Sequence, residues 1–318
     1  MAHEVRQEII TFESCGERCA GTLFLPADQQ NAPYVPIVMG AGFTGVRQMI
    51  EEFAIHFAKR GYAALTIDYR HFGESEGQPR QFLSPWREVE DYRNAMTWCE
   101  NRAELDGDRI CVWGSSFAGG IVLAVGGLDR RARAVISQVP VINGHNWLRD
   151  MRTLAQWEDL LLRLEDDRRI RAAGGEGGTI PSAADVSQGE DGAICDPGGA
   201  YFMSTLEQTY PTLKAKVTLS SLDEIITFGS DHFVQYIGPR PLLMIGVEGW
   251  DVVHSHEEVL RTYQLAREPK RIELLPYDQL GVSYGAGLLH AADTAVDFLE
   301  EVLPIGSRKG ARIGRTSF

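Results

Sequence analysis

The sequence lacks the features that would mark a secreted or membrane-spanning protein. No stretch approaches the roughly 18 consecutive apolar residues that a membrane helix needs. Residues Met1–Gln7 are charged and no apolar segment follows them, so we expect no signal peptide. The cysteines form an odd set without a C-x-x-C pair, which favours free thiols in a reducing compartment over a disulfide framework. They are Cys15, Cys19, Cys99, Cys111 and Cys195. We therefore expect a soluble cytoplasmic protein.

Positive charge is also scarce. The 318 residues include 31 Lys and Arg against 44 Asp and Glu, which gives a formal net charge of −13. Nucleic acid and anionic membranes attract basic surfaces, so neither is expected as a partner. We expect a small-molecule substrate and leave a homodimer open. Apart from His254-x-His256 no close pair of metal ligands stands out, and we predict neither a metal nor another cofactor.

A serine in a tight turn is the feature around which the chain is organised. A short apolar run, Arg109–Trp113, leads into Gly114-Ser115-Ser116-Phe117-Ala118-Gly119-Gly120, and a second apolar run follows. Read as strand, turn and helix, this is a nucleophile elbow of the G-x-S-x-G type, with alanine in the last position. The elbow exposes the serine hydroxyl and directs the next backbone N–H to the place where an oxyanion forms. Ser116 is the candidate nucleophile and the Phe117 N–H a candidate oxyanion donor.

A second glycine-rich loop can complete the oxyanion hole. Residues 34–39 read as a buried strand that runs into Gly40-Ala41-Gly42-Phe43-Thr44-Gly45. Glycines allow backbone amides to approach a ligand closely. We expect the Phe43 N–H to be the second donor, although a plain turn would look the same on its own.

Strand-like and helix-like segments alternate along most of the chain. Residues 8–12 and 19–25 suggest an antiparallel edge hairpin. Strands are then expected at 34–39, 62–69, 109–113, 132–139, 241–247 and 271–275, and helices at 49–60, 85–105, 257–266 and 286–303. This alternation predicts an α/β fold with a mostly parallel sheet and crossover helices, whose ligands collect beyond the carboxyl ends of the strands.

The alternation is interrupted once. Residues 146–227 contain two helix-like stretches, the first of them heavily charged, around a glycine-rich part. We predict a helical lid here, with the α/β core formed by residues 1–145 and 228–305. Residues available to line a site under this lid are Trp147, Trp157, Tyr201, Phe202 and Met203. A surface helical excursion without ligand contact is the alternative. Residues 306–318 are expected to form a disordered basic tail.

Three motifs together resemble the α/β-hydrolase superfamily, in its branch of dienelactone-hydrolase-like and polyketide-processing esterases. They are residues 68–77, residues 113–120, and Arg267-Glu268-Pro269-Lys270 before the last strand. The similarity spans about residues 20–143 and 238–303. It implies a catalytic Ser116, an oxyanion hole from the Phe43 and Phe117 amides, and an acid after residues 242–247. Asp251 matches that acid best, with Glu248 as the fallback.

The resemblance breaks at the third member of the triad. The family's histidine follows the last strand, and counting from Pro276 and from the closing helix places Gln279 there. Histidine takes and returns the serine proton because its reference pKa is near 6.5, whereas an amide does neither. In a well-studied serine protease, loss of the histidine costs about 10⁶ in turnover. Gln279→His should then raise hydrolysis of a generic p-nitrophenyl ester.

Other histidines could act as a substitute base or contact the substrate. His71 and His145 fall on loops at the carboxyl edge of the predicted sheet, and His232 closes the inserted segment. His254 follows Asp251 on the same edge, but a solvated loop is the simpler expectation for it.

Three functions remain open from the sequence. The first is an α/β-hydrolase-fold enzyme with an altered triad that acts on a small apolar ester, lactone or polyketide-type carbonyl compound. The second is a lyase, isomerase or cyclase that polarises a carbonyl in the same pocket with Ser116 and Gln279. The third is a binding protein that has lost catalysis.

Overall fold

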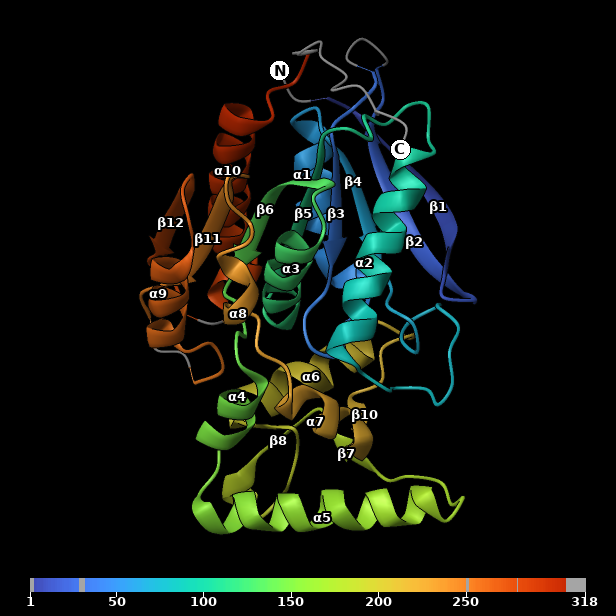
Figure 1. The fold of residues 1–318 in the computed structure, drawn as a ribbon, viewed down its shortest axis with the longest axis vertical. Helices are drawn as coiled ribbons and strands as arrows, with labels where there is room; N and C mark the ends of the chain where they lie inside the picture. Colours follow the sequence, from blue (N-terminus) through green and yellow to red (C-terminus); the bar gives the residue numbers. More distant parts are fainter. Residues whose placement is uncertain (1–2, 29–31, 250–251, 279, 307–318) are drawn as a thin grey trace, which may run out of the picture.

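The computed structural model describes residues 3–28, 32–249, 252–278 and 280–306. At its centre is an eight-stranded sheet in the order β1-β2-β4-β3-β5-β6-β11-β12 (Figure 1). The β1–β2 and β2–β4 pairs are antiparallel and the others are parallel. The predicted mostly parallel sheet is therefore confirmed. The strands are β1 Val5–Ser14, β2 Glu17–Pro26, β3 Pro36–Gly40, β4 Ala63–Ile67, β5 Ile110–Ser115, β6 Ala132–Gln138, β11 Leu242–Val247 and β12 Lys270–Leu275.

Helices cover both faces of the sheet. One apolar cluster joins α1 and α10 to the sheet, and a second joins α2, α3 and α9 to it. The helix α3 is apolar on all sides and almost completely buried, as its sequence suggested. The bounds are α1 Glu51–Lys59, α2 Pro85–Glu100, α3 Phe117–Leu128, α8 Asp231–Val234, α9 His256–Leu265 and α10 Gly285–Val302, and a 3₁₀ turn, η1, spans Arg47–Ile50.

The expected elements differ from the observed ones mainly at their ends. The edge hairpin is present, but its strands are longer than residues 8–12 and 19–25. The helix expected over residues 85–105 ends at Glu100. The residues expected to form its last turn are not helical. Among them, Leu105 forms an isolated β-bridge with Tyr34, just before β3.

The segment between β6 and β11 lies at the carboxyl end of the sheet (Figure 1). It contains α4 Gly144–Asp150, α5 Leu154–Ala172, β7 Thr179–Pro181, β8 Ala183–Ala184, η2 Val186–Gln188, β9 Ile194–Cys195, α6 Pro197–Thr209, β10 Lys216–Thr218 and α7 Leu219–Ile226. Besides these helices, the glycine-rich part and the stretch before α7 form two small two-stranded sheets, which the sequence did not predict.

The inserted segment touches the core at the loops that follow β3 and β4. The hydroxyls of Thr44 and Ser182 lie 3.0 Å apart, and the Thr218 N–H donates to the Gln81 carbonyl at 3.0 Å. No helix among the described residues is long and apolar enough to cross a membrane. All five cysteines are free. The predicted basic tail falls outside the described residues from 307 onward.

Candidate active site

Ser116 sits at the junction between β5 and α3 in a conformation that L-residues rarely adopt. Its φ and ψ are 59° and −123°, and strain of this kind gathers at functional sites. The Ser116 N–H donates to the Gln138 carbonyl at 2.9 Å, and the Ser116 carbonyl accepts from the Val141 N–H at 3.0 Å. The end of β6 and the loop after it thus hold both backbone groups of Ser116, and the half-buried serine has the geometry of a nucleophile elbow.

The elbow depends on a small residue two positions before the serine. A Cβ added to Gly114 would lie 2.2 Å from the carbonyl oxygen of Ala118, which is backbone and cannot yield easily. The close approach of β5 to the first turn of α3 therefore requires glycine at this position.

The loop after β3 lies directly against the serine. A Cβ on Gly42 would meet the Ser116 Cβ at 2.9 Å and its Oγ at 3.3 Å. Among the described residues, neither the Phe43 nor the Phe117 backbone N–H has a hydrogen-bond acceptor. The Phe117 amide also belongs to the first turn of α3, where N–H groups have no partner within the helix and favour negative charge. Both amides are suited to bind an oxyanion.

A buried ion pair anchors this loop to the sheet. Arg47 is 3% exposed and pairs with the fully buried Asp68, and the Arg47 backbone N–H donates to the same carboxylate at 2.7 Å. Burial raises the pKa of Asp68 above its ordinary value, and the Arg47 guanidinium opposes that rise. Removing one partner of such a pair leaves a buried charge uncompensated. The pair therefore ties the far end of this loop, where η1 begins, to the residue that directly follows β4.

His254 contacts the serine. Its Nε2 lies 2.8 Å from the Ser116 Oγ, and the residue is 8% exposed. The expectation that His254 lies on a solvated loop was wrong. Which nitrogen carries the proton depends on the tautomer, but the distance is that of a hydrogen bond between a serine and its general base. The hydroxyl is therefore paired with an imidazole that comes from the loop after β11.

The histidine loop is held where it enters α9. Ser255 caps α9 by accepting from the Glu258 N–H at 3.3 Å, and the Glu258 carboxylate accepts from the Asn146 side chain at 2.6 Å. Burial raises the pKa of Glu258 above its ordinary value. Because Asn146 lies in α4, the inserted segment is tied to the helix that directly follows His254.

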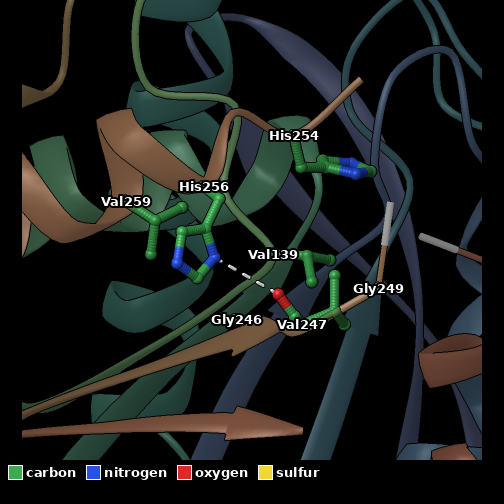
Figure 2. A pocket seen from close by; sticks show the side chains of 7 residues that line it. All are labelled: Val139, Gly246, Val247, Gly249, His254, His256 and Val259. Carbon is green, nitrogen blue, oxygen red and sulfur yellow. Dashed lines mark hydrogen bonds between the residues drawn. The ribbon is translucent and has the colours of Figure 1, made fainter. Parts of the chain in front are cut away.

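A small cavity lies behind the histidine. Figure 2 shows His254 and His256 at its wall, with the His256 Nδ1 turned to the Val247 carbonyl at 3.3 Å. The cavity measures about 30 Å³, which holds one water but no acyl group. His256 thus belongs to the support of the loop and has no contact with Ser116.

The other candidate histidines lie elsewhere. The His71 Nδ1 bonds the Pro79 carbonyl at 3.0 Å, and burial lowers the pKa of His71. His145 is exposed and packs edge-on to Trp157, while His232 packs edge-on to Phe233. Of the four histidines considered from the sequence, the structure brings only His254 to the serine.

The expected acid and the expected histidine position are not described. Asp251 and Gln279 both fall outside the described residues, so their assignments stay predictions. Glu248, the fallback acid, directly follows β11 and is exposed.

The side chains of the two residues that carry the candidate oxyanion amides belong to a cluster of aromatic rings. The ring of Phe43 lies edge-on to those of Phe117 and Trp147, with centroids 6.0 and 5.1 Å away, and Phe117 also contacts Phe228 at 6.2 Å. Trp147 comes from the inserted segment and the other three from the core. Tyr201, expected from the sequence to line the site, is 78% exposed and does not.

No group of three or more potential metal ligands occurs within the part of the chain that the structure describes. The groups available for chemistry are the Ser116 hydroxyl, the His254 imidazole and the candidate amides of Phe43 and Phe117.

A nucleophile elbow on a mostly parallel sheet, with an imidazole at its hydroxyl, is the arrangement of an α/β hydrolase. A family model described as X-Pro dipeptidyl-peptidase (S15 family) matches residues 16–278. The chain belongs to this family, and the resemblance to α/β hydrolases expected from its motifs is confirmed.

The comparisons also find relatives named for small-molecule chemistry. Quorum-quenching protein AidA of Acinetobacter baumannii (strain MDR-ZJ06) is 38% identical over 158 residues, which are 49% of this chain and 51% of AidA. The match thus spans about half of AidA. Polyketide transferase claH of Penicillium crustosum is 27% identical over 264 residues, 81% of this chain and 85% of claH.

Among solved structures, the α/β hydrolase GrgF from Penicillium sp. sh18 has a TM-score of 0.80 with 23% identity, and the likeness covers 93% of this chain and 99% of GrgF. This likeness confirms the fold. The chain is thus an α/β-hydrolase-fold protein related to polyketide-processing enzymes.

Proposed function

We propose that this protein is a serine acyl hydrolase or acyl transferase that acts on a small, largely apolar ester, lactone or polyketide-type thioester. The observation that carries the proposal is the 2.8 Å contact between the Ser116 Oγ and the His254 Nε2. An imidazole at that distance removes the main objection raised by Gln279, because a group that can take and return a proton already touches the hydroxyl.

The reaction begins with attack of the Ser116 Oγ on the carbonyl carbon. The proton of the hydroxyl passes to His254, and the carbonyl oxygen becomes an oxyanion that the Phe43 and Phe117 amides stabilise. Collapse of the tetrahedral species breaks the bond to the alcohol or thiol, which takes the proton from His254. An acyl-serine remains.

Water or a second nucleophile then releases the acyl group. His254 removes a proton from the incoming nucleophile and returns it to Ser116 as the acyl bond breaks. Asp251 stays the predicted acid, and it precedes His254 in the sequence.

The aromatic surroundings support an apolar acyl group. Phe43 and Phe117, whose amides are the candidate oxyanion donors, pack ring against ring, and Phe117 also contacts the ring of Phe228. Of the relatives, claH is named a polyketide transferase, which fits transfer of such a group.

The test is to trap the acyl-enzyme. The purified protein is mixed with a p-nitrophenyl or thioester substrate, quenched in acid and weighed by mass spectrometry. We expect a mass increase equal to the acyl group on the peptide that contains Ser116. Turnover that persists in Ser116→Ala without any adduct would instead support the lyase or isomerase alternative.

A further inference from the structure

Thr44 holds a backbone conformation that β-branched residues rarely adopt. Its φ is 54°, and it is the third residue of the turn that the Gly45 N–H closes on the Gly42 carbonyl at 2.9 Å. Turns with a positive φ at this position usually carry glycine or asparagine there. Such strain persists only where the surroundings hold the residue in place. The turn that carries the candidate oxyanion amide of Phe43 therefore depends on contacts made from outside it.

One of these contacts is a buried hydroxyl of the inserted segment. The Oγ of Ser182, between β7 and β8, lies 3.0 Å from the Oγ1 of Thr44, and the two residues are 0% and 3% exposed. The distance is that of a hydrogen bond. The backbone of Ser182 is fixed on both sides, since its N–H donates to the Ala215 carbonyl and its carbonyl accepts from the Ile194 N–H, both at 3.0 Å. The hydroxyl thus reaches Thr44 from a well-supported position.

An apolar cluster joins the same two parts of the chain. Val46, which is 1% exposed, belongs to one cluster with Met203 and Leu206 of α6 and with Leu213. It lies two residues beyond Thr44, directly before η1. The inserted segment therefore contacts this loop at two neighbouring positions, one polar and one apolar.

We infer that Ser182 is a positioning residue for the oxyanion hole, because through Thr44 it holds the turn in the shape that presents the Phe43 N–H. This N–H has no acceptor within the described part of the chain, so the shape of the turn alone directs it. The inference rests on the proposed function, in which the Phe43 N–H stabilises the oxyanion. It adds that the inserted segment helps to build the catalytic site without touching the reacting atoms.

Loss of the Ser182 hydroxyl leaves the strain at Thr44 unopposed on that side. The residue can then relax to a negative φ, and the turn shifts together with the Phe43 N–H. An oxyanion donor acts as charge develops on the carbonyl oxygen, so its displacement slows acylation and leaves binding of the ester nearly unchanged. Removal of a whole donor costs about 10²–10³ in kcat, and we expect about tenfold for a displaced one.

The experiment follows the first turnover of p-nitrophenyl butanoate by stopped flow, which separates the acylation rate constant from the apparent dissociation constant of the ester. Ser182→Ala should lower the rate constant about tenfold and change the dissociation constant by less than about twofold. Ser221→Ala is the matched control. Ser221 is also fully buried in the inserted segment, and its Oγ accepts from the Leu83 N–H of the core at 2.8 Å, on the loop after β4. We expect it to acylate at nearly the wild-type rate.

Two substitutions of Thr44 test the role of its positive φ. Both remove the hydroxyl, but valine keeps the strain of a β-branched residue, whereas glycine adopts a positive φ freely. We expect Thr44→Val to lose as much of the acylation rate as Ser182→Ala, and Thr44→Gly to lose clearly less. These variants also test the inference from the core side if Ser182→Ala does not fold.

An unchanged acylation rate constant in Ser182→Ala, or an equal loss in Ser221→Ala, would overturn the inference. Equal losses in Thr44→Val and Thr44→Gly, or a loss confined to the dissociation constant of the ester, would also contradict it. Failure of the proposed function itself looks different, because the wild type would then form no acyl-serine in the mass spectra.

Discussion

The Ser116 Oγ and the His254 Nε2 lie 2.8 Å apart although 138 residues separate them in the chain. Ser116 directly follows β5 and His254 lies in the loop after β11, and only β6 lies between these strands in the sheet. The parallel arrangement brings both loops to the same edge, which is where α/β proteins assemble their sites. The base therefore comes from the loop that was expected to supply the acid.

Removal of the nucleophile should stop the reaction. Ser116→Ala deletes the atom that becomes acylated, and we expect turnover of a p-nitrophenyl ester to fall by about 10⁴–10⁶. The control is Ser115→Ala, because Ser115 is buried and its Oγ accepts from the Gln138 side chain at 3.3 Å, away from the reaction. Comparable losses in both variants would point to damage of the turn rather than loss of a nucleophile.

Removal of the imidazole should have a comparable effect. In His254→Gln the new amide can still hydrogen-bond the serine but cannot take its proton, so kcat should fall by about 10⁴ or more. His256→Gln is the matched control on the same loop, and we expect it to keep most of the activity. Steady-state kinetics on one ester measures both. An active His254→Gln enzyme would rule out His254 as the base.

Gln279→His distinguishes the two assignments of the base. The sequence alone predicts a gain in ester hydrolysis, because it restores the family's histidine at that position. With His254 already against Ser116, we expect little change instead, and no recovery when the substitution is added to His254→Gln. Recovery of hydrolysis in that double variant would show that position 279 faces the serine.

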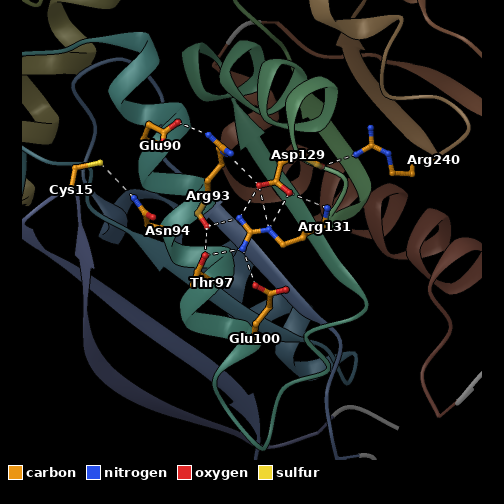
Figure 3. A network of polar contacts seen from close by, with 9 residues as sticks. All are labelled: Cys15, Glu90, Arg93, Asn94, Thr97, Glu100, Asp129, Arg131 and Arg240. Carbon is orange, nitrogen blue, oxygen red and sulfur yellow. Dashed lines mark hydrogen bonds and ion pairs between the residues drawn. The ribbon is translucent and has the colours of Figure 1, made fainter. Parts of the chain in front are cut away.

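The hydrogen bonds and ion pairs of Asp129 predict how the free energy of unfolding depends on pH. Asp129, at the end of α3, accepts from the Arg131 side chain at 2.7 and 3.0 Å and from the Arg93 Nε at 3.2 Å (Figure 3). Burial alone would raise the pKa of Asp129, but these hydrogen bonds and charges lower it from 3.8 to about 2. A carboxyl with a lowered pKa in the folded state stabilises the fold above its unfolded pKa.

Asp129→Asn should therefore lower the free energy of unfolding at pH 7 by about 2 kcal/mol. The difference from the wild type should shrink as the pH falls from about 4 to about 2, because the wild-type carboxyl then becomes protonated. Urea unfolding at several pH values measures this. Asp108→Asn, at an exposed position on the loop before β5, should have no such effect; a pH-independent loss in Asp129→Asn would contradict the account.

Local patterns predicted the elbow and the sheet well. Gly114 and Ala118 must be small because β5 and the first turn of α3 approach each other closely, and this constraint acts within five residues. An apolar strand followed by an apolar helix can also be predicted from the sequence without knowledge of tertiary contacts. Buried parallel strands are continuous apolar runs, so their existence was clear even where their ends were not.

The partner of the serine was not predictable by the same means. Pairing of Ser116 with His254 depends on the path of the loop after β11 and on its support by Ser255 and Asn146, which are contacts between distant segments. The usual spacing after the last strand pointed to Gln279 instead. The available signal was that His254 follows Asp251 on the loop leaving β11, at the correct edge of the sheet.

The most direct test of the account is the rate at which a fluorophosphonate labels Ser116. The reagent reports activation of the hydroxyl itself, independently of any substrate. We predict stoichiometric labelling of the wild type at Ser116, labelling of His256→Gln at a similar rate, and labelling of His254→Gln slowed by at least about 10³. Equal labelling rates in the wild type and His254→Gln would contradict the claim that this imidazole activates the serine.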